Sequence, residues 1–130
     1  MKTLKQKNLT LLQKYYPTLC KNMKDGDENI EVINSSKGDP IPLIKKEGKI
    51  LLLHSKFDPK KEAQRLIGEI DNNHNLFIIM GFGFAYHIET LQDKLPKNSA
   101  ILVLEKDYHI INKAIASRDL TAIFEDKRII

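Results

Sequence analysis

The spacing of apolar residues divides the chain into a front part with helix and strand signals and a back part in which strands and helices alternate. Residues 2–16 carry apolar side chains at helical spacing, which predicts an amphipathic helix. Pro17 interrupts or restarts this helix, which is expected to continue for a turn or two through Lys24 and to end at residues 25–27. The side chains expected on its apolar face are Leu4, Leu11, Leu12, Tyr15 and Tyr16.

From residue 30 to residue 54 the pattern is that of strands. Apolar runs at residues 30–34, 41–44 and 49–54 are separated by turn-forming residues, which predicts a small antiparallel meander. Pro42 has no N–H to give to a neighbouring strand, so the second run is expected at an edge of this sheet.

After residue 57 the chain alternates helix and strand signals. Asp58 suits a helix N-cap, and Pro59 suits the first helical position, where no N–H is needed. Because helical crossovers join the strands that follow, we expect a parallel sheet with right-handed connections. The predicted order is a helix ended by residues 71–75, a strand at 76–80, a helix after Gly83 closed by 96–99, a strand at 101–104, a helix capped by Asp107, and a strand beginning at 128–130. The apolar residues expected to be buried on these helices are Ala63, Leu66, Ile67 and Ile70, then Ile88, Leu91 and Leu95, then Ile110, Ile111, Ala114 and Ile115.

These elements predict an α/β fold, a Rossmann-like partial parallel sheet preceded by an N-terminal helix and a small β-meander. Residues 1–56 would form the helix and meander, and residues 57–130 the Rossmann-like unit. A natural domain rarely stops as it enters its core. The strand that opens at residues 128–130 therefore suggests the front end of a longer protein.

Composition narrows the class of protein. The chain has 130 residues, 42% of them hydrophobic and 29% charged, which is ordinary for a globular domain. Its net charge of +4 comes from dispersed lysines, so we expect a solubility feature and no nucleic-acid partner. A single cysteine, Cys20, fits a reducing cytoplasm, and apolar runs of about five residues predict no membrane association. The histidines lack metal-ligand spacing, so no zinc site is expected.

A glycine-bearing turn is the first candidate for chemistry. Gly81 and Gly83 match the first two glycines of the G-x-G-x-x-G fingerprint, but Tyr86 replaces the third. Glycines at such a turn let a phosphate or sugar approach a helix N-terminus, although the same pattern also makes a tight turn without a ligand. His87 follows and could either donate to an anion or serve only in packing.

Glu105 is the second candidate, because it ends the strand after the turn. A carboxylate at this place accepts hydrogen bonds from ribose hydroxyls in nucleotide or S-adenosylmethionine sites. It could instead face solvent or pair with Lys106. His54 and Ser55 are expected either to line a polar site or to bind nearby backbone. The candidate cofactor-binding residues are Gly81, Gly83, Tyr86, His87 and Glu105.

Three segments together resemble a known family. Residues 53–63 read LHSKFDPKKEA, residues 81–87 read GFGFAYH, and residues 104–107 read LEKD. This combination resembles the N-terminal region of the motility-associated factor (Maf) glycosyltransferases, over roughly residues 49–116. Phe84 and the missing third glycine depart from the pattern of that family.

The resemblance implies a bacterial cytoplasmic protein that transfers a nonulosonic acid, of pseudaminic or legionaminic type, from a CMP-activated donor to flagellin Ser/Thr residues. In that family the transferase centre lies in the domain that follows this region. The resemblance therefore implies an accessory Rossmann-like domain that is not catalytic alone and has no cofactor of its own. A nucleotide or CMP-sugar and the flagellin acceptor would be partners of the longer protein.

Two other functions remain open. A truncated S-adenosylmethionine-dependent methyltransferase would place Gly81 and Gly83 at the cofactor and Glu105 on its ribose, but Met80 stands where an acidic residue is usual. A non-catalytic interaction module would leave the glycine turn without a ligand.

Overall fold

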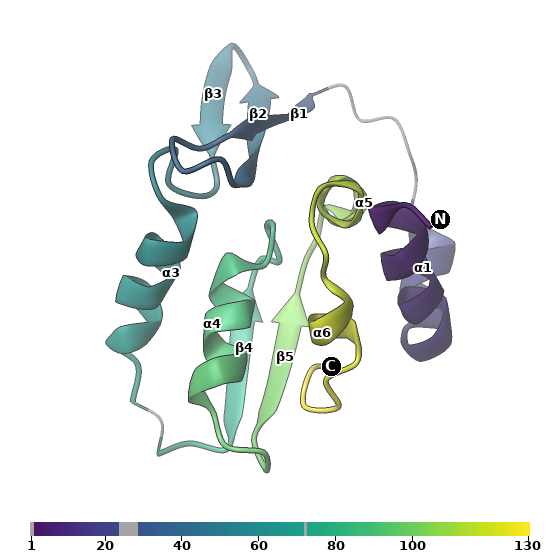
Figure 1. Ribbon diagram of the computed structural model, residues 1–130, viewed down its shortest axis with the longest axis vertical. Coiled ribbons are helices and arrows are strands. Elements are labelled where there is room, and N and C mark those ends of the chain that lie inside the picture. Colours follow the sequence, from purple (N-terminus) through teal and green to yellow (C-terminus); the bar gives the residue numbers. More distant parts are fainter. Residues whose placement is uncertain (1, 24–28, 72) are drawn as a thin grey trace.

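The computed structural model describes residues 2–23, 29–71 and 73–130. The helix end predicted at residues 25–27 lies outside the described residues. A three-stranded antiparallel sheet and a two-stranded parallel sheet are combined with helices, which confirms the predicted α/β fold class (Figure 1). In chain order the elements are α1 (Leu4–Tyr15), α2 (Pro17–Asn22), β1 (Ile30–Asn34), β2 (Pro40–Lys46), β3 (Lys49–Leu52), α3 (Pro59–Gly68), β4 (Leu76–Met80), α4 (Tyr86–Lys94), β5 (Ala100–Leu104), α5 (Tyr108–Ser117) and α6 (Thr121–Phe124).

Helix α1 packs on α5 and α6 through a narrow strip of side chains. Leu12 is fully buried as predicted, whereas Leu4 and Tyr15 are exposed, because only this strip faces the core. The strip also contains Asn8, which the apolar pattern could not reveal. Asn8 is fully buried and forms hydrogen bonds with the backbone at the C-terminal end of α5.

The meander is antiparallel as predicted, but its strand order is β1-β2-β3, so the prediction that the second strand lies at an edge is wrong. The N–H of Lys45 points to β1, where it donates to the Asn29 carbonyl. Because successive N–H groups alternate, the nitrogen of Pro42 faces the β3 side. Pairing with β3 begins only at Leu43, so the missing N–H costs no ladder hydrogen bond.

The parallel sheet begins with the pairing of Leu76 with Ala100 and ends with that of Met80 with Leu104. The predicted third strand is present as a single parallel bridge between Ile101 and Ile129. The Ile130 N–H donates to the Ile101 carbonyl at 2.8 Å. The described order is therefore β4, β5 and then this C-terminal segment. The meander and α5 lie at the end toward which the arrow of β5 points (Figure 1).

Helices α3 and α5 begin at the N-caps predicted from the sequence. The Asp58 carboxylate accepts from the Lys61 N–H at 3.0 Å, and Asp107 accepts from the His109 N–H at 3.0 Å. All residues expected on the buried faces of α4 and α5 are buried. On α3, however, Leu66 is 58% exposed, because α3 packs mainly on α4 and Leu66 lies at the open cleft. The short helix α6 was not predicted.

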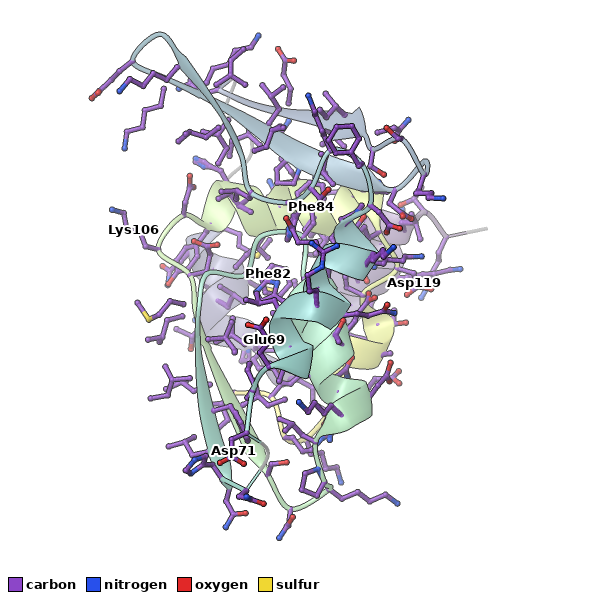
Figure 2. All side chains as sticks on the ribbon, turned by 90° about the vertical axis from the view of Figure 1, so that its left-hand side faces the viewer. Glu69, Asp71, Phe82, Phe84, Lys106 and Asp119 are labelled. Carbon is purple, nitrogen blue, oxygen red and sulfur yellow. The ribbon has the colours of Figure 1, made fainter. Side chains whose placement is uncertain are left out.

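The helices cover the two faces of the parallel sheet unequally. Phe77 is buried, while Leu76, Ile78 and Met80, the alternate residues of β4, are exposed. Figure 2 shows the same asymmetry, since α3 and α4 lie on one side of the strands. Leu12, Ile41 and Ile101, from α1, β2 and β5, belong to one apolar cluster, so the meander is joined to the α/β part through the core.

Candidate functional site

A cleft of about 380 Å³ lies at the carboxyl ends of β4 and β5, beside α3. Four of the five predicted site residues line it; Tyr86 does not. His54, which follows the meander, and Glu62 of α3 are brought to the same cleft. Its lining residues are Leu53, His54, Glu62, Ala63, Leu66, Met80, Gly81, Gly83, His87, Glu105 and Ile110.

The two glycines of the turn are required for different reasons. Gly81 has a φ of +100°, a conformation that side chains rarely adopt, while no described atom lies within 4 Å of where its Cβ would be. Gly83 has a φ of +52°, and a Cβ there would lie 2.7 Å from Nε2 of His54. The second glycine therefore makes room for a side chain of the protein itself.

Glu105 folds back onto the turn. Its Oε1 accepts from the N–H groups of Phe82 at 3.0 Å and Gly83 at 3.4 Å, and its Oε2 accepts from the Asp107 N–H at 3.1 Å. It therefore neither faces solvent alone nor pairs with Lys106, which projects outward in Figure 2. Backbone N–H groups of such turns bind phosphate in nucleotide sites, and here a carboxylate of the protein holds that position.

His54 binds nearby backbone, which is one of the two roles expected from the sequence. Its Nε2 accepts from the Phe84 N–H at 2.9 Å, so the proton of the neutral ring is on Nδ1. Burial lowers the pKa of His54 to about 4, and the neighbouring His87 and Arg118 lower it as well. The ring is therefore neutral near pH 7. Ser55 also binds backbone, because its hydroxyl accepts from the Phe57 and Asp58 N–H groups.

His87 closes the other side of the turn. Its Nε2 lies 2.9 Å from the Gly81 carbonyl oxygen, and because a carbonyl only accepts, Nε2 carries the proton. Burial lowers the pKa of His87, although the bond to Gly81 and the charge of Glu105 oppose this shift. The neutral ring keeps Nδ1 as a hydrogen-bond acceptor. This favours a neutral histidine over the charged anion donor that the sequence allowed.

Tyr86 has a structural position. Its side chain is buried, and its hydroxyl donates to the Pro40 carbonyl at 2.5 Å, which ties α4 to the meander. The Arg118 guanidinium lies 3.8 Å from the centre of its ring, and His54 meets the ring edge-on. Burial raises the pKa of Tyr86 to about 12. The side chain that replaces the third glycine is thus directed away from the cleft.

The side chains that line the cleft are acidic or neutral. Glu62 and Glu105 are its carboxylates, and among the described residues that line it there is no lysine or arginine. Glu62 also helps to shape the cleft, since its Oε1 accepts from the Ser55 N–H at 2.9 Å. The sequence analysis did not predict Glu62 as a site residue. The signal that could have found it is its place in the LHSKFDPKKEA segment.

A second hollow, of about 420 Å³, lies beyond Met80 and Glu105 and is almost entirely apolar. Residues from α1, α2, α5, α6 and the C-terminal segment surround it. Its lining residues are Leu12, Tyr16, Leu19, Met80, Phe82, Val103, Leu104, Glu105, Lys106, Tyr108, Ile111, Ile123, Phe124, Ile129 and Ile130. Polar groups that could orient a ligand are few there, so the smaller cleft is the better candidate site.

Comparison with known proteins adds a structural relative. The solved structure of a Maf glycosyltransferase from Magnetospirillum magneticum AMB-1 is similar to 97% of this chain with a TM-score of 0.69, at 11% sequence identity. The chain has the fold of one part of that enzyme. This similarity confirms the Maf resemblance seen in the sequence at the level of the fold. The chain covers 26% of the enzyme.

At the level of sequence, one relative matches part of the chain. An uncharacterized protein of Treponema pallidum (strain Nichols) is 31% identical over 81 residues, which are 59% of this chain and 27% of that protein. No family model matches the chain. The chain thus spans about a quarter of the length of both relatives.

Two further properties bear on the kind of site. No helix in the described ranges is long and apolar enough to cross a membrane. The described His, Cys, Asp and Glu residues form no group of three or more that could hold a metal ion.

Proposed function

We propose that this chain is an accessory domain of a Maf-like glycosyltransferase. The observation that carries the proposal is the fold similarity to the Magnetospirillum Maf glycosyltransferase over 97% of the chain. The three sequence segments that resemble the Maf family also support it, because residues of all three line the cleft. The proposed reaction of the whole protein is transfer of a nonulosonic acid from a CMP-activated donor to Ser/Thr residues of flagellin.

In this proposal the domain positions the donor and does not carry out the transfer. Gly81, Gly83, His87 and Glu105 line the cleft in which the donor would make contact. The bonds within the cleft support this role, since His54 and Glu105 hold the turn rigid through its backbone. A preorganised wall of this kind lowers the entropic cost of binding.

The methyltransferase alternative is less well supported. It requires Glu105 to bind ribose, yet Oε1 of Glu105 is shared by two backbone N–H groups of the turn. An interaction module has one specific observation in its favour, the exposed apolar residues Leu76, Ile78 and Met80 on one face of β4. That face adjoins the cleft, because Met80 belongs to both surfaces.

The transferase role is tested in the organism. Deletion of the gene should remove the nonulosonic acid from flagellin peptides, which mass spectrometry measures, and the intact gene should restore it. Unchanged flagellin glycosylation would overturn the proposed reaction.

The ligand role is tested by chemical-shift mapping of the 130-residue chain. CMP and a CMP-nonulosonic acid should shift the amide signals of Gly81 and Gly83, and S-adenosylmethionine should not. Shifts with S-adenosylmethionine alone would favour the methyltransferase, and no shift with any of the three would exclude a donor contact in this cleft.

A further inference from the structure

We infer that the cleft binds a neutral, hydroxyl-bearing ring of its ligand and rejects phosphate, because Glu105 already occupies the anion position of the turn. The inference rests on the proposed function and names the part of the donor that the cleft contacts. For a CMP-activated donor, that part is the ribose, because the nonulosonic acid ring carries a carboxylate, and the phosphate would lie outside the turn.

Each backbone N–H of the turn already has an acceptor within the protein. The Gly81 N–H donates to the Leu104 carbonyl at 2.7 Å, and the Ala85 N–H donates to the Phe82 carbonyl at 2.9 Å. Between them, the N–H groups of Phe82 and Gly83 donate to Glu105, and that of Phe84 donates to His54. All five N–H groups of residues 81–85 therefore have an acceptor within the protein.

A phosphate at this turn would have to displace a side chain. In sites that hold phosphate, the turn N–H groups point at the ligand and have no internal acceptor. Here the displaced group would be a carboxylate that also accepts from the Asp107 N–H. The turn geometry alone, two glycines with positive φ, does not distinguish these cases. The position of Glu105 does.

The charge of the cleft also disfavours phosphate. A phosphate in it would meet the carboxylates of Glu62 and Glu105, and no cationic side chain is found among its described lining residues. The histidines do not supply the missing charge. Burial lowers the pKa of both His54 and His87, so neither ring is protonated near pH 7. Like charges at close range disfavour the complex.

The cleft offers hydrogen-bond acceptors and apolar walls to a ligand. His87 keeps Nδ1 as an acceptor, and Glu62 uses only Oε1 on the Ser55 N–H. Hydroxyl groups donate to such acceptors. Leu53, Leu66 and Ile110 supply apolar walls, against which the C–H face of a sugar ring can pack. A neutral polyhydroxylated ring satisfies both kinds of surface.

The test uses calorimetry and amide chemical shifts with three probes, namely cytidine, CMP and inorganic phosphate. Cytidine and CMP should bind within about threefold of each other, with shifts at Gly81, Gly83 and His87, and phosphate should shift none of them. Glu105→Ala frees the turn N–H groups, so CMP should then bind at least tenfold more tightly than cytidine. If Glu105→Ala does not fold, Glu105→Gln is measured instead. It keeps an acceptor of the same shape, so the ratio of CMP to cytidine affinity should stay as in the wild type.

Each other result has a definite meaning. If phosphate alone shifts the Phe82 and Gly83 amides of the wild type, or if CMP binds tenfold more tightly than cytidine, the inference is overturned while a donor contact in the cleft still stands. If none of the probes binds, the donor contact fails and the inference fails with it. Glu69→Gln, at an exposed position outside the cleft, is the matched control for loss of a carboxylate and should change no ratio.

Discussion

The glycine turn before α4 and the backbone after α5 are both held by a polar side chain from a distant position, but in different surroundings. Glu105 accepts from the turn at the wall of an open cleft. Asn8 donates to the carbonyls of Ile115 and Arg118 and accepts from the Leu120 N–H within the core. Water can therefore replace such a bond at the cleft but not in the core, which separates a binding surface from a structural one.

The largest effect is expected at Asn8. Asn8→Ala removes the partner of a buried carbonyl, a part-buried carbonyl and a buried N–H, which should lower the free energy of unfolding by about 4 kcal/mol. Urea denaturation at pH 7 measures the change. Asn22→Ala is the matched control, because its amide bonds only the exposed end of α2, and it should cost less than about 0.5 kcal/mol. Equal losses would show that the bonds of Asn8 contribute no more than those on the surface.

The second effect is a pH dependence of the free energy of unfolding, which arises from a histidine of the cleft. The pKa of His54 is about 4 in the folded protein and 6.5 ordinarily, so the unfolded chain binds more protons between these values. Stability is therefore retained above pH 6.5 and lost as the pH falls toward 4, by about 3 kcal/mol for a shift of this size. His87, whose pKa is also lowered, adds to the loss in the same direction.

Urea denaturation at several pH values between 7 and 4 checks this dependence. His54→Gln removes the titrating group, so its stability should fall less steeply with acid than that of the wild type. His74→Gln, at an exposed position, should leave the slope unchanged. A His54→Gln slope identical to that of the wild type would contradict the assignment.

The third effect separates the two glycines of the turn. Gly83→Ala introduces a Cβ that lies 2.7 Å from Nε2 of His54, so the bond to the Phe84 N–H must break or lengthen. We expect a loss of about 2 kcal/mol and a changed ¹⁵N shift of the His54 ring. Gly81→Ala strains only the backbone and should leave that shift unchanged. If both variants alter the His54 signal equally, the contact with Gly83 is not the reason for the second glycine.

Local signals were enough to predict most of the α/β part. The bounds of β4 and the caps Asp58 and Asp107 follow from five or fewer neighbouring residues, and the structure confirms them. The spacing of apolar residues also identified the buried faces of α4 and α5. The sequence also placed the glycine turn and Glu105 at one edge of the sheet, because both follow strands that pair in parallel.

Features that depend on distant partners could not be predicted. Asn8 looks like a surface residue until Leu120, 112 positions away, is placed beside it. The central position of β2 depends on where β3 begins to pair, which Pro42 alone does not reveal. The acceptor role of Glu105 required the fold, because a strand-end carboxylate can as readily face ribose, solvent or a turn.

The smallest effect is expected from the change that tests the comparison most directly. Glu105→Gln keeps an oxygen that can accept from the Phe82 N–H but removes the charge that strengthens the bond. Because the cleft admits water to this position, we expect a loss of only about 1 kcal/mol in the free energy of unfolding at pH 7. Urea denaturation measures it, with Glu69→Gln as the exposed control. A loss as large as that of Asn8→Ala would mean that the turn is as closed to solvent as the core, and the contrast between the two regions would then fail.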